Sequence, residues 1–135
     1  MHAFAQTFFT ALQDNSLELV EPLLADNVIE VIPLAADGGQ APWNVFEGKQ
    51  AVMGYLASIV TNFSQVRLED LAVYADEEAG VVFAEGRGDL VHAATGKPYR
   101  NRYVFKFQIA DGKIHRIDEY ANPVTFAKLI GAPIG

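Results

Sequence analysis

The sequence contains no cysteine, few basic residues and no long apolar run. Without cysteine, disulfide frameworks, thiolate zinc sites and cysteine nucleophiles are excluded. Acidic residues number 17 against 10 basic ones, which argues against a nucleic-acid partner, because phosphate binding needs clustered lysine and arginine. No stretch reaches the ~18 apolar residues of a membrane span, and Met1-His2-Ala3 does not open a signal peptide. We therefore expect a cytoplasmic protein that has no membrane partner.

Length and apolar content are sufficient for one well-formed core. The chain has 135 residues, and 50% of them are hydrophobic. A chain of this size buries roughly two-thirds of the surface that its unfolded form exposes. Residues 1–135 are accordingly predicted to form a single domain.

Helical patterns occupy the first quarter of the chain, and one further helical pattern follows over residues 49–60. Apolar residues recur at three- and four-residue steps from Phe4 to Leu12, which predicts a first helix. Ser16 is typical of an N-cap and predicts a second, short helix, although Pro22 is unfavourable inside it. The apolar positions of residues 49–60 predict a third amphipathic helix.

The remaining segments have the composition of strands and turns. β-Branched residues predict a strand over 28–32, before a loop over 33–43 that is rich in glycine and proline. Asp111-Gly112 is a dipeptide typical of a tight hairpin, because type I′ turns need positive φ. Four further strands are predicted, over 66–74, 80–91, 98–109 and 113–120. Helices followed by an antiparallel meander predict an α+β fold.

Histidine spacing gives no support for a metal site. His2, His92 and His115 lie on different predicted elements and show none of the close spacings of metal-ligand pairs. We therefore expect no metal.

Five short strings follow one another in a fixed order along nearly the whole chain. In this order and spacing the chain resembles the SnoaL-like branch of the nuclear transport factor 2-like superfamily, and its last strings are most similar to the phenazine-biosynthesis A/B-type members. The strings are LADNV at 24–28, FEGK at 46–49, TGKPYRNRY at 95–103, DGKI at 111–114 and EYANP at 119–123.

The resemblance implies an architecture and an assembly. It implies a cone-shaped α+β barrel, in which three helices from the N-terminal half pack on a strongly curved antiparallel sheet and enclose an apolar pocket. It also implies a homodimer joined through the sheet, and no cofactor. The superfamily includes isomerases, hydrolases, cyclases, dehydratases and binding proteins without activity, so the function must be argued from the pocket residues.

Glu119 is the first candidate for catalysis. Alignment with the related ketosteroid isomerases places His115, Ile117 and Glu119 on the cavity side of the last strand. An apolar cavity disfavours the ionised carboxylate, so the pKa should rise toward the range useful for acid–base work. The phenazine-biosynthesis A/B-type proteins also carry a working glutamate in the matching string. The alternative is that Glu119 pairs with Arg116 or Arg102 on the solvated face.

Glu30 is the second candidate, because it interrupts the otherwise apolar strand VIEVI at 28–32. Buried carboxylates are rare unless they are paired. Glu30 is either a second carboxylate in the cavity or a residue at the exposed rim. Two carboxyl groups in one apolar pocket would have separated pKa values, which suit one as an acid and the other as a base.

The chain differs from ketosteroid isomerase at the positions of that enzyme's catalytic residues. The position of the catalytic base carries Ile32, and the position of the oxyanion-hole acid falls at Tyr103. The first helix offers Phe8 and Phe9 but no tyrosine. Steroid isomerisation by that mechanism is therefore disfavoured, although the Tyr103 phenol can still donate a hydrogen bond to a ligand carbonyl.

Aromatic and polar side chains predict the walls of the pocket. Tyr99, Asn101 and Tyr103 alternate on one strand face, which suits a flat, partly polar, aromatic ligand. Trp43 in the loop is a candidate lid over the mouth of the cone. These aromatic residues fit a core equally well. The other expected ligand contacts are Phe105, Tyr55, Ile32, Ile117 and His115.

Two classes of function follow. The first is an enzyme without a cofactor that uses Glu119, with Glu30 as a second titrating group, to move a proton on a small cyclic or aromatic molecule. The reaction would be an isomerisation, cyclisation, dehydration or condensation. The alternative is a binding or carrier protein with the same pocket.

Overall fold

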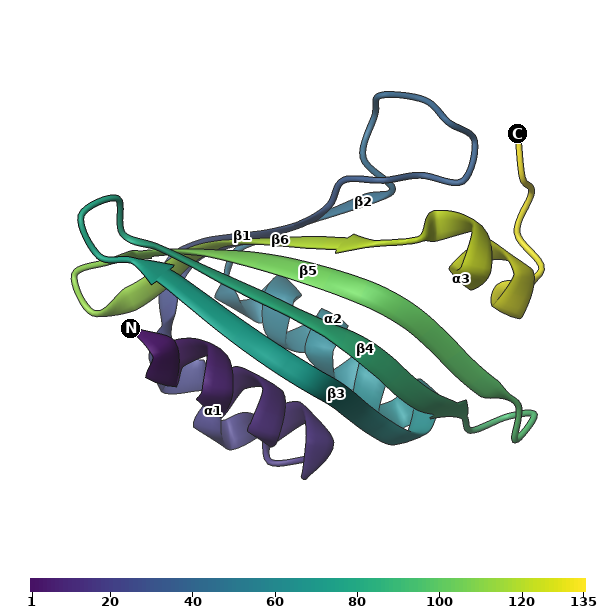
Figure 1. Ribbon diagram of the computed structural model, residues 1–135, viewed down its shortest axis with the longest axis horizontal. Helices are drawn as coiled ribbons and strands as arrows, with labels where there is room; N and C mark the ends of the chain where they lie inside the picture. Colours follow the sequence, from purple (N-terminus) through teal and green to yellow (C-terminus); the bar gives the residue numbers. More distant parts are fainter.

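The computed structural model describes residues 1–135 as a curled six-stranded sheet with helices on its inner face and at one end (Figure 1). The sheet order is β2-β1-β6-β5-β4-β3. All neighbouring strands are antiparallel except β1 and β6, which run parallel. The strands are β1 (Leu24–Ile32), β2 (Asn44–Glu47), β3 (Phe63–Asp76), β4 (Val81–His92), β5 (Pro98–Ala110) and β6 (Lys113–Ala121).

Two α-helices cover the inner face, and a third closes one end. Helix α1 (His2–Gln13) packs on β3 and β4, and α2 (Lys49–Asn62) packs on β1 and β3. Helix α3 (Pro123–Ile130) follows β6 and packs on β5 near the end of the sheet (Figure 1). None of these helices is both long and apolar enough to cross a membrane.

The predicted α+β fold and the four strands of the meander are confirmed, with three corrections. The predicted second helix is replaced by two 3₁₀ turns, η1 (Leu17–Leu19) and η2 (Glu21–Leu23), because Pro22 has no N–H to donate. The sheet is mixed, since β1 leaves the helical region and inserts beside β6 in the parallel direction. The third α-helix lies at the C-terminal end, where the sequence analysis had predicted no element.

Helix α3 carries the ordinary start and stop signals of a helix. The side chain of Asn122 accepts a hydrogen bond from the backbone N–H of Val124, and Pro123 occupies the first turn. Gly131 ends the helix in a left-handed conformation with φ of 72°. These signals were present in the sequence and would have identified the helix.

The core lies between α1, α2 and the inner face of the sheet. Phe8 and Phe9 of α1 pack edge-on against Phe105 and Phe107 of β5, with ring centroids 4.9 to 6.1 Å apart. The predicted Asp111-Gly112 turn is confirmed, because both residues have positive φ, of 53° and 71°. The aromatic cluster fills one end of the cone and leaves the other end open for a pocket.

Gly88 on β4 is predicted to be a position where only glycine fits, because a Cβ there would collide with the ring of Tyr103 and also meet Leu90. We expect Gly88→Ala to lower the free energy of unfolding by about 1–3 kcal/mol, as over-packing does elsewhere. The matched control is Gly54→Ala on α2, where a Cβ meets nothing within 4 Å. That control should be stabilising by roughly 0.5–1 kcal/mol. Urea unfolding checks both values, and equal stability of the two variants would contradict the prediction.

Candidate functional site

A pocket of about 650 Å³ opens between the inner face of the sheet, α2, α3 and the loop before β2. Of the predicted ligand contacts, Ile32, Trp43, Tyr55, Tyr99, Tyr103 and Glu119 line it. Most of the wall is apolar, with polar groups contributed by a few side chains, which is the usual character of a small-molecule site. Its aromatic side chains are Trp43, Phe46, Tyr55, Phe63, Tyr99, Tyr103 and Phe126.

Glu119 lies on β6 with its carboxylate at the pocket wall. The hydroxyl of Tyr55 on α2 lies 3.0 Å from each carboxylate oxygen and donates to them. The arginine partners considered from the sequence are not used, because Arg116 forms its ion pair with Asp118 on the other face of β6. Burial raises the pKa of Glu119, and the hydrogen bond from Tyr55 opposes part of that rise.

Glu30 lies on β1, deeper than Glu119, and is 0% exposed. It is therefore not at the exposed rim, and it does not line the open pocket. The parallel register pairs Glu30 with Ile117, so its side chain shares the inner face with Glu119, two residues further along β6. Neither carboxylate oxygen of Glu30 has a hydrogen-bond partner. Burial, and then the charge of Glu119, raise the pKa of Glu30 well above its ordinary value.

These observations favour a single proton on the carboxyl pair, held by Glu30. Two ionised carboxylates are both acceptors and cannot hydrogen-bond to each other. A proton on Glu30 removes the buried charge and supplies the missing donor, which can point at Glu119. The pair then carries one proton on Glu30 and one negative charge on Glu119, which is exposed to the pocket.

The tyrosines that surround Glu119 keep their protons. Burial is the largest cause of the raised pKa of Tyr55, Tyr99 and Tyr103, and the negative charge of Glu119 adds to it in each case. The ring of Tyr55 stacks on Phe46 at 4.4 Å, which holds its hydroxyl toward Glu119. At neutral pH these phenols are therefore neutral hydrogen-bond donors.

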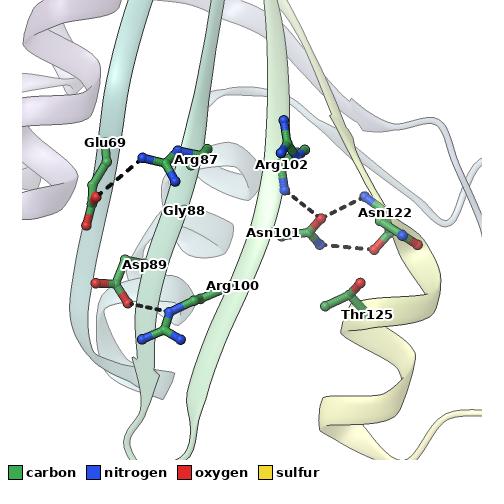
Figure 2. A pocket seen from close by; sticks show the side chains of 9 residues that line it. All are labelled: Glu69, Arg87, Gly88, Asp89, Arg100, Asn101, Arg102, Asn122 and Thr125. Atoms are coloured by element: carbon green, nitrogen blue, oxygen red, sulfur yellow. Dashed lines mark hydrogen bonds and ion pairs between the residues drawn. The ribbon is translucent and has the colours of Figure 1, made fainter.

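Asn101 does not reach the pocket, contrary to the prediction that it binds substrate. Its Nδ2 donates to the Tyr99 hydroxyl at 2.7 Å and to the Asn122 carbonyl at 3.0 Å. Its Oδ1 accepts from the backbone N–H groups of Arg102 and Asn122, and Figure 2 shows the side chain directed at the start of α3. Both polar atoms of its carboxamide have partners within the protein, and the two hydrogen bonds to Asn122 tie β5 to the β6–α3 junction.

Three other predicted contacts also lie outside the pocket. Phe105 and Ile117 point inward as expected, but they belong to the packed core below the pocket. His115 is displaced by an irregularity in the β5–β6 pairing, where Ile109 pairs with Ile114 and Gln108 with Arg116. Ile114 therefore takes the core position, and the His115 ring lies 3.1 Å from the Ala110 carbonyl at the turn.

A second, polar hollow lies mainly on the outer face of the sheet (Figure 2). No hydrophobic residue lines it. Two of its arginines already have partners, since Arg100 pairs with Asp89 at 3.5 Å and Arg87 with Glu69 at 3.9 Å. Exposed pairs of this kind contribute little binding energy. The inner pocket, with its buried carboxyl pair, is the candidate active site.

Phe126 is the main pocket residue that sequence reasoning missed. Its ring packs on Trp43 at 5.6 Å and on Tyr99 at 5.9 Å, and so closes the end of the pocket. It was missed because α3 was not predicted. The Asn122-Pro123 start signal and the apolar residues after it were the available evidence.

Comparison with known proteins places this geometry in a family. The model of the SnoaL-like domain matches residues 5–117, and the chain belongs to that family. The fold is of the nuclear transport factor 2-like and ketosteroid isomerase-like type, as the sequence resemblance implied.

Three similar proteins illustrate the match. The uncharacterized protein YesE of Bacillus subtilis is 26% identical over 92% of this chain and 82% of its own. A crystal structure of a candidate isomerase from Bacillus subtilis has a TM-score of 0.81 at 23% identity, over 98% and 93% of the two chains. A phenazine biosynthesis-related protein from Pseudomonas aeruginosa has a TM-score of 0.71 at 18% identity, over 86% and 72%.

The buried carboxyl pair predicts a pH dependence of stability. The pKa of Glu30 is ordinary in the unfolded chain and raised in the fold, so above pH ~4.5 the folded state retains a proton that the unfolded chain has lost. The contribution of Glu30 to the free energy of unfolding is therefore fully present below pH ~4.5. It is lost as the pH rises toward the pKa of Glu30 in the folded state. We expect Glu30→Gln, whose amide still donates a hydrogen bond, to gain stability relative to wild type by up to about 1.4 kcal/mol per pH unit in that window.

Urea unfolding of both proteins between pH 5 and pH 8 measures this difference. The control is Glu78→Gln, which removes a carboxylate from the exposed turn between β3 and β4. A difference between Glu30→Gln and wild type that does not change with pH would show that Glu30 does not hold a proton in the fold.

Proposed function

We propose that this protein is an enzyme that moves a proton on a small cyclic or aromatic molecule bound in the inner pocket, with Glu119 as the catalytic base. The observation that carries the proposal is the Glu119 carboxylate at the wall of an apolar pocket, held by Tyr55 and backed by the unpartnered, fully buried Glu30. The proposed chemistry uses only the protein's own groups.

Glu119 is suited to accept and return a proton. Its raised pKa makes it a stronger base than an ordinary carboxylate, while the Tyr55 hydrogen bonds keep it oriented. The proton on Glu30 prevents two negative charges from accumulating side by side. When Glu119 takes a proton from the substrate, the negative charge moves to the substrate and the carboxyl pair becomes neutral.

Tyr103 is proposed to stabilise that charge on the substrate. Its raised pKa keeps the phenol protonated, and both Tyr103 and Glu119 line the same pocket. A carbonyl oxygen that accepts from the Tyr103 hydroxyl would gain negative charge as an adjacent carbon loses its proton to Glu119. Isomerisation, cyclisation, dehydration and condensation can each begin with this step.

Removal of the base tests the proposal. Deuterium exchange at the α-carbons of 2-tetralone, a cyclic aryl ketone, is followed by proton NMR in D₂O. We expect Glu119→Gln to slow the exchange catalysed by the protein by about 10²- to 10⁴-fold, which is the usual contribution of a general base. Affinity for the ketone should change little, because the amide keeps the shape of the side chain.

Glu78→Gln in the exposed β3–β4 turn is the control and should exchange at the wild-type rate. A Glu119→Gln variant that exchanges as fast as wild type would contradict the role of Glu119. Wild-type protein that binds the ketone but exchanges nothing would favour the alternative function, a carrier that uses the same pocket without turnover.

We also propose that two copies of the chain associate through the outer face of the sheet. Four large apolar side chains that are 38–59% exposed lie together on that face: Tyr74, Phe83, Val104 and Tyr120. Strand pairing sets Tyr74 opposite Phe83 and Val104 opposite Tyr120. The two pairs are diagonal neighbours across β4 and β5, where Phe83 pairs with Lys106 and Val104 with Glu85. A contiguous exposed apolar patch is typical of an interaction surface.

A charge in the centre of this patch tests the association. We expect Val104→Glu to convert the dimer to a monomer in sedimentation velocity, because burial of an unpaired carboxylate opposes association. The control is Leu19→Glu, which changes an exposed apolar residue of η1 away from the sheet face. Dimers that persist in Val104→Glu, or a wild-type protein that is monomeric at micromolar concentration, would contradict the proposed interface.

A further inference from the structure

The walls of the inner pocket carry a negative charge and no positive one. Its lining residues include neither lysine, arginine nor histidine, and Glu119 is their only acidic group. Two basic residues close in sequence to the pocket residues form ion pairs with other carboxylates. Lys49 pairs with Asp26, and Arg116 pairs with Asp118. The side-chain donor that reaches the Glu119 carboxylate, the Tyr55 hydroxyl, is neutral. The charge on Glu119 therefore has no counter-ion within the pocket.

Aromatic rings surround the same space. Phe126 packs edge-on against both Trp43 and Tyr99, and Tyr99 stacks with Phe63 at 5.6 Å. Tyr55 and Tyr103 line the same pocket close to Glu119. The face of an aromatic ring is negative and attracts a cation that has lost part of its hydration shell.

From this arrangement we infer that the pocket selects small ring compounds that carry a positively charged nitrogen. The ring occupies the aromatic wall, and the charged nitrogen supplies the counter-ion that Glu119 lacks. An anionic ligand should bind weakly, because it would place a second negative charge beside Glu119. The net charge of the chain, -7, adds to this repulsion. The class of ligand is thus defined by its charge as well as by its shape.

This inference adds a ligand class to the proposed function. It depends on that proposal in one respect only, namely that the inner pocket is the ligand-binding site. It concerns equilibrium binding, whereas the catalytic role of Glu119 is measured by deuterium exchange. The two can therefore fail separately. A protein that exchanges protons on a neutral ketone but shows no preference for cations would keep the first proposal and lose the second.

The test compares three ligands that share a hydroxyphenyl ring and differ in charge. They are 3-hydroxy-N,N,N-trimethylanilinium, its uncharged isostere 3-tert-butylphenol, and the anion 3-hydroxybenzoate. Isothermal titration calorimetry at pH 7.0 measures each on the full chain. We expect the cation to bind about tenfold more tightly than the isostere, and the anion to bind more weakly than either.

Variants then assign the preference to the pocket carboxylate. Glu119→Gln should reduce the ratio of cation to isostere affinity by about fivefold or more, while Glu119→Asp, which keeps the charge, should retain most of it. Glu78→Gln removes an equal charge from the exposed β3–β4 turn and should leave the ratio unchanged. Circular dichroism confirms that each variant is folded, and the wild-type series decides the main point even if one is not.

Several results would overturn the inference. The cation could fail to bind, the isostere could bind as tightly as the cation, or the anion could bind best. Equal loss of preference in Glu119→Gln and Glu78→Gln would assign the selectivity to the overall charge of the protein instead of the pocket. Retention of the full preference in a folded Glu119→Gln protein would assign it to the aromatic rings alone and remove Glu119 from the explanation.

Discussion

A carboxyl group that has lost all contact with water needs a proton or a positive charge beside it, and Glu30 has no cation as a neighbour. Its side chain is fully buried and neither oxygen has a donor, so the group is stable in this position as the neutral acid. Protonation turns it from an acceptor into a donor. The ionisation of Glu119, and with it the chemistry proposed for the pocket, depends on whether Glu30 keeps this proton.

The surrounding structure maintains this arrangement through packing from several elements. Parallel pairing of β1 with β6 sets Glu30 beside Ile117 and hence close to Glu119. Helix α2 brings the Tyr55 hydroxyl from the opposite side, and its ring is stacked on Phe46 of β2. A carboxylate positioned by a strand and a helix, with rings packed around it, is preorganised to a degree that a loop residue seldom reaches.

The closed end of the pocket is built by a different interaction. Asn101 uses its carboxamide to join β5 to the residues that begin α3, and Phe126 of that helix then packs on Trp43 and Tyr99. A residue predicted to orient substrate thus acts on the frame of the pocket. Its polar groups are satisfied within the protein, and a ligand would have to break those hydrogen bonds to use them.

Much of this could be predicted from the sequence, because local patterns define elements and faces. Period-two alternation identified β5 and put Tyr99 and Tyr103 on one side, and Asp111-Gly112 identified the turn after it. The family resemblance, through alignment with the ketosteroid isomerases, put Glu119 on the cavity side of β6. A glutamate inside an apolar strand marked Glu30 as unusual. The alignment failed at His115, where a shift in pairing register puts Ile114 inward.

Only the tertiary structure decided which of these residues meet. Alternation gives the side of a strand but neither its neighbour nor the depth of a side chain, so the parallel β1–β6 pairing, the full burial of Glu30 and the contact of Tyr55 with Glu119 were not accessible from the chain alone. The last of these joins residues 64 positions apart. Such contacts depend on how the sheet curls and how α2 packs across it, which are properties of the whole core and not of any short segment.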